Sequence, residues 1–291
     1  MDILTSILLK HNIKESFINA KKMDKENRIF ISDNFVVKIY YPKKFQYYYN
    51  ELEVYKNLSN KDYLANLHGY GEEEGYKYII ISRLKGKSLF DSWDSYDVTQ
   101  RKDFIKQIST ILKDINNIRN EEVNFKDHLN NIFNSTFNSL EFSKNFLEYI
   151  KETYLELLTC ISDIEDANLI HIDTHFYNFF VNDGKIFAYD FENTIMAPLD
   201  YQLLRWYRMW RYPESFYYPK NSLTQEQIDS YNILMPELLN NYESLYKNKN
   251  YNERVKLYSL IYLLQEANRC NLPEEKVKKY IRENKDIRLR G

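Results

Sequence analysis

LIHIDTHFYNFFVNDGKIFAYDFE, residues 169–192, is the stretch that decides the fold of this chain. It contains Asp173, then Asn178 five positions later, then Asp190 twelve positions after that. A carboxylate can accept a proton from a hydroxyl group, while an Asn amide and a second carboxylate offer the oxygen ligands that Mg²⁺ prefers. This order and spacing are typical of sites that transfer a phosphoryl group from a nucleotide to an alcohol.

The same residues resemble the motifs of the aminoglycoside phosphotransferase and choline kinase-like superfamily. In that superfamily the first motif usually reads His-Gly-Asp-x-His-x-x-Asn, and the second reads Ile-Asp-Phe-Glu or Ile-Asp-Phe-Asp. Here the first spans residues 171–178 and the second ends in Asp190-Phe-Glu192, so the order and spacing match. Two departures are Ile172 in place of the usual Gly and Tyr189 before the second Asp.

The resemblance implies a role for each matching residue. Asp173 is expected to accept the proton of the acceptor hydroxyl as the catalytic base, and Asn178 and Asp190 to ligate Mg²⁺ at the nucleotide phosphates. His171 and His175 are expected to shape the loop. A competing interpretation makes His171, Asp173 and His175 the ligands of a hydrolytic metal site, but no further His lies nearby in the sequence to complete it.

A Lys and a Glu upstream fit the same chemistry. Kinases hold the nucleotide phosphates with a strand Lys that pairs with a Glu from the following helix. Residues 36–39, VVKI, form an apolar stretch that resembles the Val-Ala-Ile-Lys strand of kinases and contains Lys38. Glu51 in the next predicted helix is expected to meet Lys38, with Glu53 as the fallback. A single Lys in a strand usually just contacts solvent. The role expected for Lys38 therefore depends on the order of its strand, the Glu-bearing helix and the later motif at residues 171–178.

The resemblance also predicts where the nucleotide base binds. Residues 79–84, IIISRL, are expected to lead to the hinge between two lobes, with adenine against the backbone of Ser82, Arg83 and Leu84. A strand–turn–helix connection without any nucleotide site could have the same sequence. The two cannot be separated, because a base recognised by backbone groups requires no particular side chains.

The segment expected to cover the phosphates departs from the family pattern. Residues 20–27, AKKMDKEN, contain no Gly, so the close approach of the backbone to a phosphate is lost. The side chains of Lys21, Lys22 or Asn27 are the expected substitutes. The missing glycines are the main argument for the alternative that the chain is a catalytically inactive relative of the kinases.

Hydrophobic periodicity predicts a small mixed α+β lobe followed by a mainly helical region, and the resemblance implies that together they form an α+β, two-lobed, protein-kinase-like fold. Residues 1–85 are predicted as a nucleotide-binding lobe with a small mixed β-sheet, including two strands joined by a turn within residues 28–40 and a helix over 45–59. Residues 86–291 are predicted as a larger, mainly helical catalytic and substrate-binding lobe. A hairpin at Asn182-Asp183-Gly184 interrupts its helices. The predicted helices cover residues 99–118, 127–139, 142–162, 196–211, 223–247 and 252–268.

The acceptor is expected to be a small molecule. Only nine residues separate Asp190 from Asp200, which is too few for the long segment that presents peptides in protein kinases. The resemblance makes Asp200 an internal partner of the catalytic loop, and the alternative is an N-cap of the next helix. Aminoglycoside, choline-like amine, sugar and homoserine-like acceptors all stay open. Four aromatic residues could cage an ammonium group, although core packing is the commoner role: Trp206, Tyr207, Trp210 and Tyr212.

Composition excludes several other classes. The 291 residues are 44% hydrophobic and 28% charged with a formal net charge of −2, which gives no reason to expect a nucleic-acid partner. Two cysteines indicate a reducing compartment. No stretch approaches the roughly 20 apolar residues that cross a bilayer, so we expect a cytoplasmic protein without a membrane partner. The oligomeric state stays open.

Together these features predict a small-molecule kinase with ATP, or alternatively GTP, and Mg²⁺ as its cofactors. The alternative is a catalytically inactive kinase-like protein with a binding or structural role.

Overall fold

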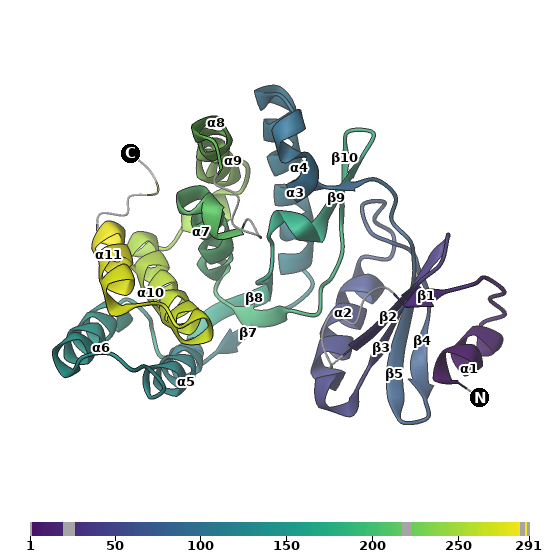
Figure 1. The fold of residues 1–291 in the computed structure, drawn as a ribbon, viewed down its shortest axis with the longest axis horizontal. Coiled ribbons are helices and arrows are strands. Elements are labelled where there is room, and N and C mark those ends of the chain that lie inside the picture. The colour runs from purple at the N-terminus through teal and green to yellow at the C-terminus, as the bar shows by residue number, and fades with distance from the viewer. Residues whose placement is uncertain (1, 20–26, 217–222, 286–288, 290–291) are drawn as a thin grey trace. The chain divides into compact units, whose positions relative to one another are not determined.

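Five strands near the N-terminus form one antiparallel sheet with the order β1-β2-β3-β5-β4 (Figure 1). The structure, a computed structural model, describes residues 2–19, 27–216, 223–285 and 289. The strands are β1 (Ile18–Asn19), β2 (Asn27–Ile31), β3 (Phe35–Tyr40), β4 (Leu67–Glu73) and β5 (Tyr76–Ser82). The predicted pair of strands within residues 28–40 is confirmed by β2 and β3.

Two helices cover opposite faces of this sheet (Figure 1). Because side chains alternate along a strand, Val37 and Ile39 of β3 face one side, where α1 (Ile3–Lys10) packs through Ile3 and Ile7. Lys38 and its neighbours on the other face point toward α2 (Phe45–Asn57). The alternation therefore places a charged residue of β3 beside a helix.

A second, smaller sheet has the order β10-β9-β6, and its first strand begins five residues after the end of β5. Its hairpin turns at Asp183 (φ 49°) and Gly184 (φ 76°), the positive φ pair that a two-residue hairpin requires. Gly86 (φ 117°) has no room for a side chain, because a Cβ atom there would lie 2.2 Å from the carbonyl oxygen of Val181. The elements of this region are β6 (Lys87–Ser88), α3 (Leu89–Ser92), α4 (Val98–Asn116), β9 (Phe179–Asn182) and β10 (Lys185–Ala188).

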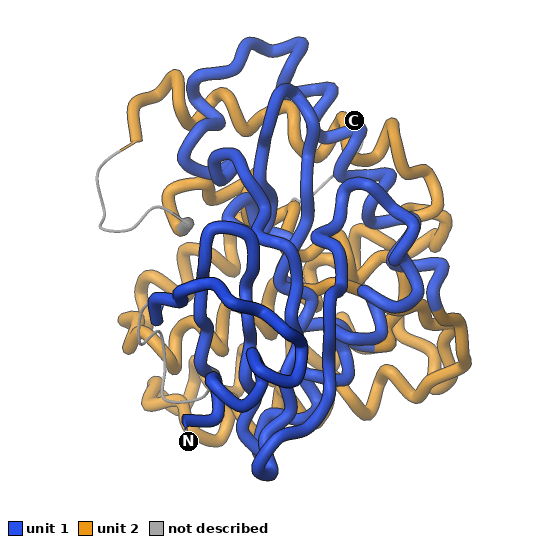
Figure 2. Tube along the Cα trace, turned by 90° about the vertical axis from the view of Figure 1, so that its right-hand side faces the viewer, with its two compact units in different colours: residues 1–118, 173–195 blue, residues 119–172, 196–291 orange. Residues whose placement is uncertain are grey.

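The chain divides into two compact units (Figure 2). Unit 1 comprises residues 1–118 and 173–195, and unit 2 comprises residues 119–172 and 196–291. The boundary expected after residue 85 falls inside unit 1, and the division by function into a nucleotide lobe and a substrate lobe stays a prediction. All the residues proposed for catalysis, metal and nucleotide belong to unit 1.

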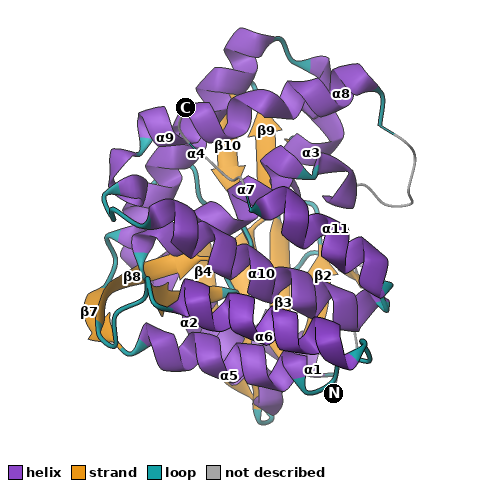
Figure 3. Ribbon diagram, turned by 90° about the vertical axis from the view of Figure 1, so that its left-hand side faces the viewer, coloured by secondary structure: helices purple, strands orange, loops and turns teal. Residues whose placement is uncertain are grey.

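Unit 2 is mainly helical (Figure 3). Its longest helix, α10 (Tyr251–Cys270), packs against α5, α6, α7 and α11. The other helices are α5 (Phe125–Phe137), α6 (Lys144–Leu158), α7 (Leu203–Arg211), α8 (Gln225–Ser230), α9 (Leu234–Asn241) and α11 (Glu274–Asn284). A three-stranded sheet has the order β11-β8-β7. Its strands are β7 (Asn120–Val123), β8 (Glu165–His171) and β11 (Thr194–Ala197). The last two residues of β11 belong to unit 2.

Short 3₁₀ helices connect these elements, and two of them correct the sequence prediction. The single helix expected over 223–247 is wrong, because α8 ends at Ser230 and α9 begins at Leu234. Pro236 lies in the first turn of α9, where the N–H that proline lacks has no partner within the helix. The helix expected from residue 196 is also wrong at its start, because β11 and Pro198 precede α7. The 3₁₀ helices span Pro42–Lys44, Trp93–Ser95, Phe176–Asn178, Leu199–Gln202, Pro213–Phe216, Tyr231–Ile233 and Glu243–Tyr246.

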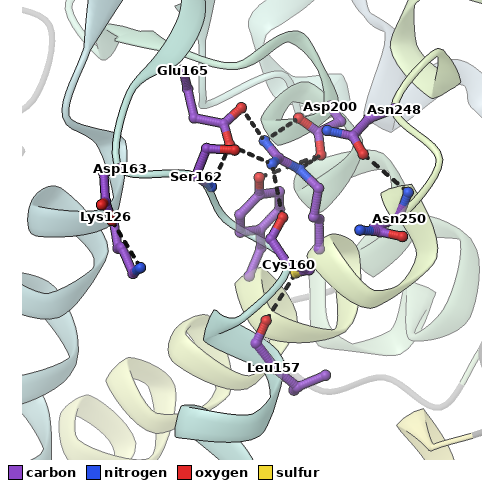
Figure 4. A network of polar contacts seen from close by, with 11 residues as sticks. Lys126, Leu157, Cys160, Ser162, Asp163, Glu165, Asp200, Asn248 and Asn250 are labelled. Atoms are coloured by element: carbon purple, nitrogen blue, oxygen red, sulfur yellow. Dashed lines mark hydrogen bonds and ion pairs between the residues drawn. The ribbon is translucent and has the colours of Figure 1, made fainter.

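A buried arginine ties three elements of unit 2 together. Arg254 of α10 is 1% exposed and contacts Asp200 (Nη2–Oδ1, 3.1 Å) and Glu165 (Nη1–Oε1, 2.8 Å), two of the residues labelled in Figure 4. Tyr258 donates to Asp200 Oδ2 at 3.3 Å. Burial raises the pKa of Asp200, and the Arg254 charge opposes that rise. In the structure Asp200 therefore serves as a partner of Arg254.

Arg254→Met is expected to lower the free energy of unfolding by about 3–5 kcal/mol, because it leaves the buried Asp200 and the partly buried Glu165 without their cation. Urea denaturation at neutral pH measures this. The matched control is Lys126→Met, which removes an ion pair to Asp163 whose side chain is 83% exposed. That change should cost no more than about 1 kcal/mol. Equal losses in the two variants would contradict a stabilising role for Arg254.

No helix of the described residues combines the length and the apolar character needed to cross a membrane.

Candidate functional site

A buried Lys–Glu pair lies at the centre of unit 1. Lys38 Nζ is 2.8 Å from Glu51 Oε1 and 2.9 Å from Glu51 Oε2. Lys38 is 6% exposed and Glu51 is fully buried. The pair forms because β3 directs Lys38 to the face that α2 covers, and Glu51 lies on the buried side of α2 between Tyr48 and Tyr55. Burying two charges costs free energy, so such a pair marks a candidate functional site.

Asp190 joins this pair from a distant part of the sequence. Its Oδ1 lies 2.7 Å from Lys38 Nζ, and its side chain is 31% exposed. Asp190 follows the hairpin of β9 and β10 and adopts a left-handed backbone with φ 65°, a region that few residues other than Gly enter. Lys38 therefore bonds two carboxylates, one fully buried and one that solvent or a ligand can reach.

The charges around Lys38 set its protonation. Burial alone would lower the pKa of Lys38, but the charges of Asp190 and Glu51 outweigh it and raise that pKa well above its ordinary value. Lys38 therefore stays a cation at neutral pH. The surroundings of Glu192 disfavour its charged form, because burial and the nearby Asp190 charge raise its pKa to about 7.

Two side chains that the sequence analysis missed support this arrangement. The hydroxyl of Tyr40 donates to Glu51 Oε2. Asn50 donates from Nδ2 to the carbonyl oxygens of Glu192 and Thr194, both at 2.9 Å. Tyr40 could have been found, since it lies two residues after Lys38 on the same face of β3. The reach of Asn50 to residues so distant in sequence carries no local signal.

Asp173 and Asn178 lie on one short loop of unit 1. Asn178 donates from Nδ2 to the carbonyl oxygen of Asp173 at 2.8 Å, and its backbone N–H donates to the His175 carbonyl at 2.9 Å. His175 Nε2 lies 3.4 Å from Asp173 Oδ1. The Asp173 side chain is 24% exposed and can meet a substrate, whereas Asn178 is buried. His171, in unit 2, is buried and accepts a hydrogen bond from Gln202 at its carbonyl.

Tyr189 links the Asn178 loop to Asp190. Its backbone N–H donates to the Asn178 carbonyl at 3.2 Å, and its hydroxyl donates to the Tyr177 carbonyl. Burial raises the pKa of Tyr189 to about 12, so the hydroxyl keeps its proton and acts as a donor.

The oxygen atoms near Asp190 suit a hard divalent cation. Within the described residues, Glu51, Asp190 and Glu192 form a group that could share a metal ion. One ligand atom from each of them lies within 4.8 Å of the other two. The set of His171, Asp173 and His175 does not occur as such a group there. Asn178 uses its amide nitrogen for the bond to the Asp173 carbonyl, so Oδ1 is the atom of this side chain that could ligate a cation. Carboxylate and amide oxygens are the ligands of Mg²⁺ and Ca²⁺.

Of the three predicted hinge residues, Ser82 ends β5, and Arg83 and Leu84 follow it. The backbone N–H of Ser82 donates to Asn66 at 2.9 Å, and that of Arg83 donates to Asn34 at 2.7 Å. Across residues 2–19, 27–216, 223–285 and 289, the N–H of Leu84 has no such partner. Of the three amides, that of Leu84 is the one left to donate to a ligand.

The segment expected to cover the phosphates, residues 20–27, lies outside the described residues except for the backbone of Asn27, where β2 begins.

Comparison with known proteins gives a consistent picture of the fold. Neither a protein-family model nor a curated protein matches the chain. The solved structure of the aminoglycoside phosphotransferase APH(2'')-Ib with ADP bound matches with a TM-score of 0.65 at 16% identity, over 98% of this chain and 97% of that one. This chain has the fold of the aminoglycoside phosphotransferases.

Two further structures extend the likeness. The streptomycin–ATP complex of APH(2'')-IIa matches with a TM-score of 0.65 at 15% identity, covering 99% of this chain and 97% of that one. A choline/ethanolamine kinase family protein from Mesorhizobium loti matches with a TM-score of 0.54 at 11% identity, covering 97% and 92%. The predicted fold class, α+β and protein-kinase-like, is confirmed, and so is the suspected resemblance at the level of the fold.

Proposed function

We propose that this chain is a small-molecule kinase that transfers the γ-phosphate of ATP to a hydroxyl group of a small acceptor, with Asp173 as the catalytic base. The observation that carries the proposal is Lys38, which contacts both Glu51 and Asp190 in the same unit that contains Asp173 and Asn178. A buried Lys–Glu pair next to a reachable carboxylate is the arrangement that phosphoryl transfer uses.

Each residue has a distinct task in this reaction. Lys38 holds the nucleotide phosphates, and Glu51 fixes the Lys38 ammonium through two hydrogen bonds. Asp190 Oδ1 and Asn178 Oδ1 would hold Mg²⁺, which when bound neutralises charge on the phosphate oxygens. Asp173 orients the acceptor hydroxyl and takes its proton at a carboxylate oxygen, with His175 Nε2 3.4 Å from Oδ1.

The nucleotide base is proposed to bind at Ser82, Arg83 and Leu84, with the Leu84 N–H as donor. ATP is the proposed nucleotide, and GTP is the alternative that the same backbone groups could accept. A requirement for ATP agrees with the predicted cytoplasmic location.

The acceptor is proposed to be a small hydroxyl compound of the aminoglycoside, choline or sugar type. Residues 194–202 form β11 and a 3₁₀ helix, which leaves no long segment for presenting a peptide. One structure with this fold holds streptomycin together with ATP. In unit 2, Trp206 and Tyr207 are fully buried and Tyr212 nearly so, which favours core packing over an ammonium cage.

Addition of MgATP is expected to stabilise the protein. At about 1 mM nucleotide and an affinity near 0.1 mM, mass action adds about 1.4 kcal/mol, which corresponds to a rise in Tm of roughly 2–4 °C. Differential scanning fluorimetry measures this, with ATP plus EDTA as the control that removes the metal. Identical Tm values with MgATP, with ATP plus EDTA and without nucleotide would contradict the proposed function and favour the inert alternative.

A further inference from the structure

Tyr189 occupies an unusual position between two candidate metal ligands. It directly precedes Asp190 and makes two hydrogen bonds to the segment that ends in Asn178, from its N–H to the Asn178 carbonyl at 3.2 Å and from its hydroxyl to the Tyr177 carbonyl. Its ring packs against Phe180, with 5.0 Å between the ring centroids. These two bonds extend the β9–β10 ladder, which pairs Phe179 with Ala188, and the hydroxyl contributes the side-chain contact between the two segments.

The backbone of Asp190 needs to be held by its surroundings. Its φ of 65° lies in the left-handed region, which a non-glycine residue keeps only when neighbouring contacts fix it. On the far side, Asn50 binds the carbonyls of Glu192 and Thr194 at 2.9 Å each. On the near side the fixing contacts come from Tyr189. Unlike Asn50, Tyr189 bonds to the segment that contains Asn178, through its N–H and its hydroxyl.

We propose that Tyr189 is a positioning residue whose hydroxyl sets the spacing between Asn178 and Asp190 for a single divalent cation. This inference rests on the proposed function. Mg²⁺ demands near-ideal octahedral geometry with short metal–oxygen distances, while Ca²⁺ accepts longer and more variable ones. A clamp between two ligand-bearing segments therefore matters more for Mg²⁺ than for Ca²⁺. Outer partners of metal ligands commonly contribute tenfold or more to metal affinity.

Tyr189→Phe tests the hydroxyl alone, because the ring and its packing against Phe180 are kept. Metal affinity is measured without turnover, by electron paramagnetic resonance of Mn²⁺ bound in the presence of ADP and its displacement by Mg²⁺ or Ca²⁺. The expected result is a loss of about tenfold in Mg²⁺ affinity and of less than about threefold in Ca²⁺ affinity. The midpoint of thermal unfolding without metal should stay close to that of the wild type.

Tyr63→Phe is the matched control. It also removes a single hydroxyl from unit 1, one that donates to Asp114 at 2.7 Å, and neither residue belongs to the proposed site. Both metal affinities should be unchanged in this variant. A selective loss of Mg²⁺ affinity in Tyr189→Phe alone supports the proposal.

Two outcomes would overturn it. Wild-type Mg²⁺ affinity in Tyr189→Phe would show that the hydroxyl does not set the spacing. Equal losses for Mg²⁺ and Ca²⁺ together with a lower unfolding midpoint would assign the bond to stability instead. If the wild-type protein binds no Mn²⁺ with ADP, the proposed function itself fails, and that result is distinct from both.

Discussion

Asp173→Asn is expected to lower kcat by about 10³- to 10⁴-fold, because the amide cannot accept the proton of the acceptor hydroxyl. The substitution keeps the size of the side chain. It also keeps the hydrogen bond from Asn178 to residue 173, since that bond uses the backbone carbonyl. The loop should therefore hold its conformation, and MgATP affinity should change by no more than about twofold. ADP formation with a stimulating hydroxyl compound gives kcat, and isothermal titration calorimetry gives the affinity.

The control for this prediction is Asp163→Asn, which removes a carboxylate that is 83% exposed and lies in unit 2. It should leave both kcat and nucleotide affinity unchanged. If Asp173→Asn turns over at a rate near that of the wild type, Asp173 is not the catalytic base.

Lys38→Met is expected to abolish nucleotide binding and to destabilise the protein. The variant loses the cation proposed to hold the phosphates, and it leaves Glu51 fully buried without its partner. An uncompensated buried carboxylate costs about 3–5 kcal/mol of folding free energy. A loss of binding in this variant alone could therefore reflect partial unfolding.

The double variant Lys38→Met/Glu51→Gln separates the two effects. Glu51→Gln removes the buried charge and keeps an oxygen for the Tyr40 hydroxyl. We expect urea denaturation to show that most of the lost stability returns, while calorimetry still shows MgATP affinity at least about 100-fold below that of the wild type. Wild-type affinity in a stable double variant would contradict the role of Lys38.

The parts of the site that depend on local order could be predicted from the sequence. Lys38 follows from a strand with one polar residue, and Glu51 from the helix that comes next, because consecutive elements are usually neighbours in space. The turn at Asp183 and Gly184 follows from its residue types. Asp173, Asn178 and Asp190 follow from a spacing that a short hairpin keeps nearly fixed. The roles of these residues in catalysis stay predictions.

The contacts that join distant segments could not be predicted in the same way. Asn50 binds carbonyls that lie 142 and 144 residues further on, and backbone acceptors leave no pattern in the sequence. The Tyr189 hydroxyl also meets a backbone carbonyl, and period-two alternation gave no reason to expect it. The strand β8 was missed because its first residues, Glu165 and Asp166, are acidic and interrupt the apolar pattern. Arg254 was missed because its partners come from β8 and a 3₁₀ helix.

The most direct test of the central claim is ADP formation from MgATP by the wild-type protein and by Asp173→Asn, across a panel of aminoglycosides, amino alcohols and sugars. The account predicts that at least one compound raises ADP formation by the wild type, with a phosphate monoester as product, and that Asp173→Asn shows no such stimulation. Equal ADP formation by the two proteins with every compound, and with water as the only acceptor, would contradict it.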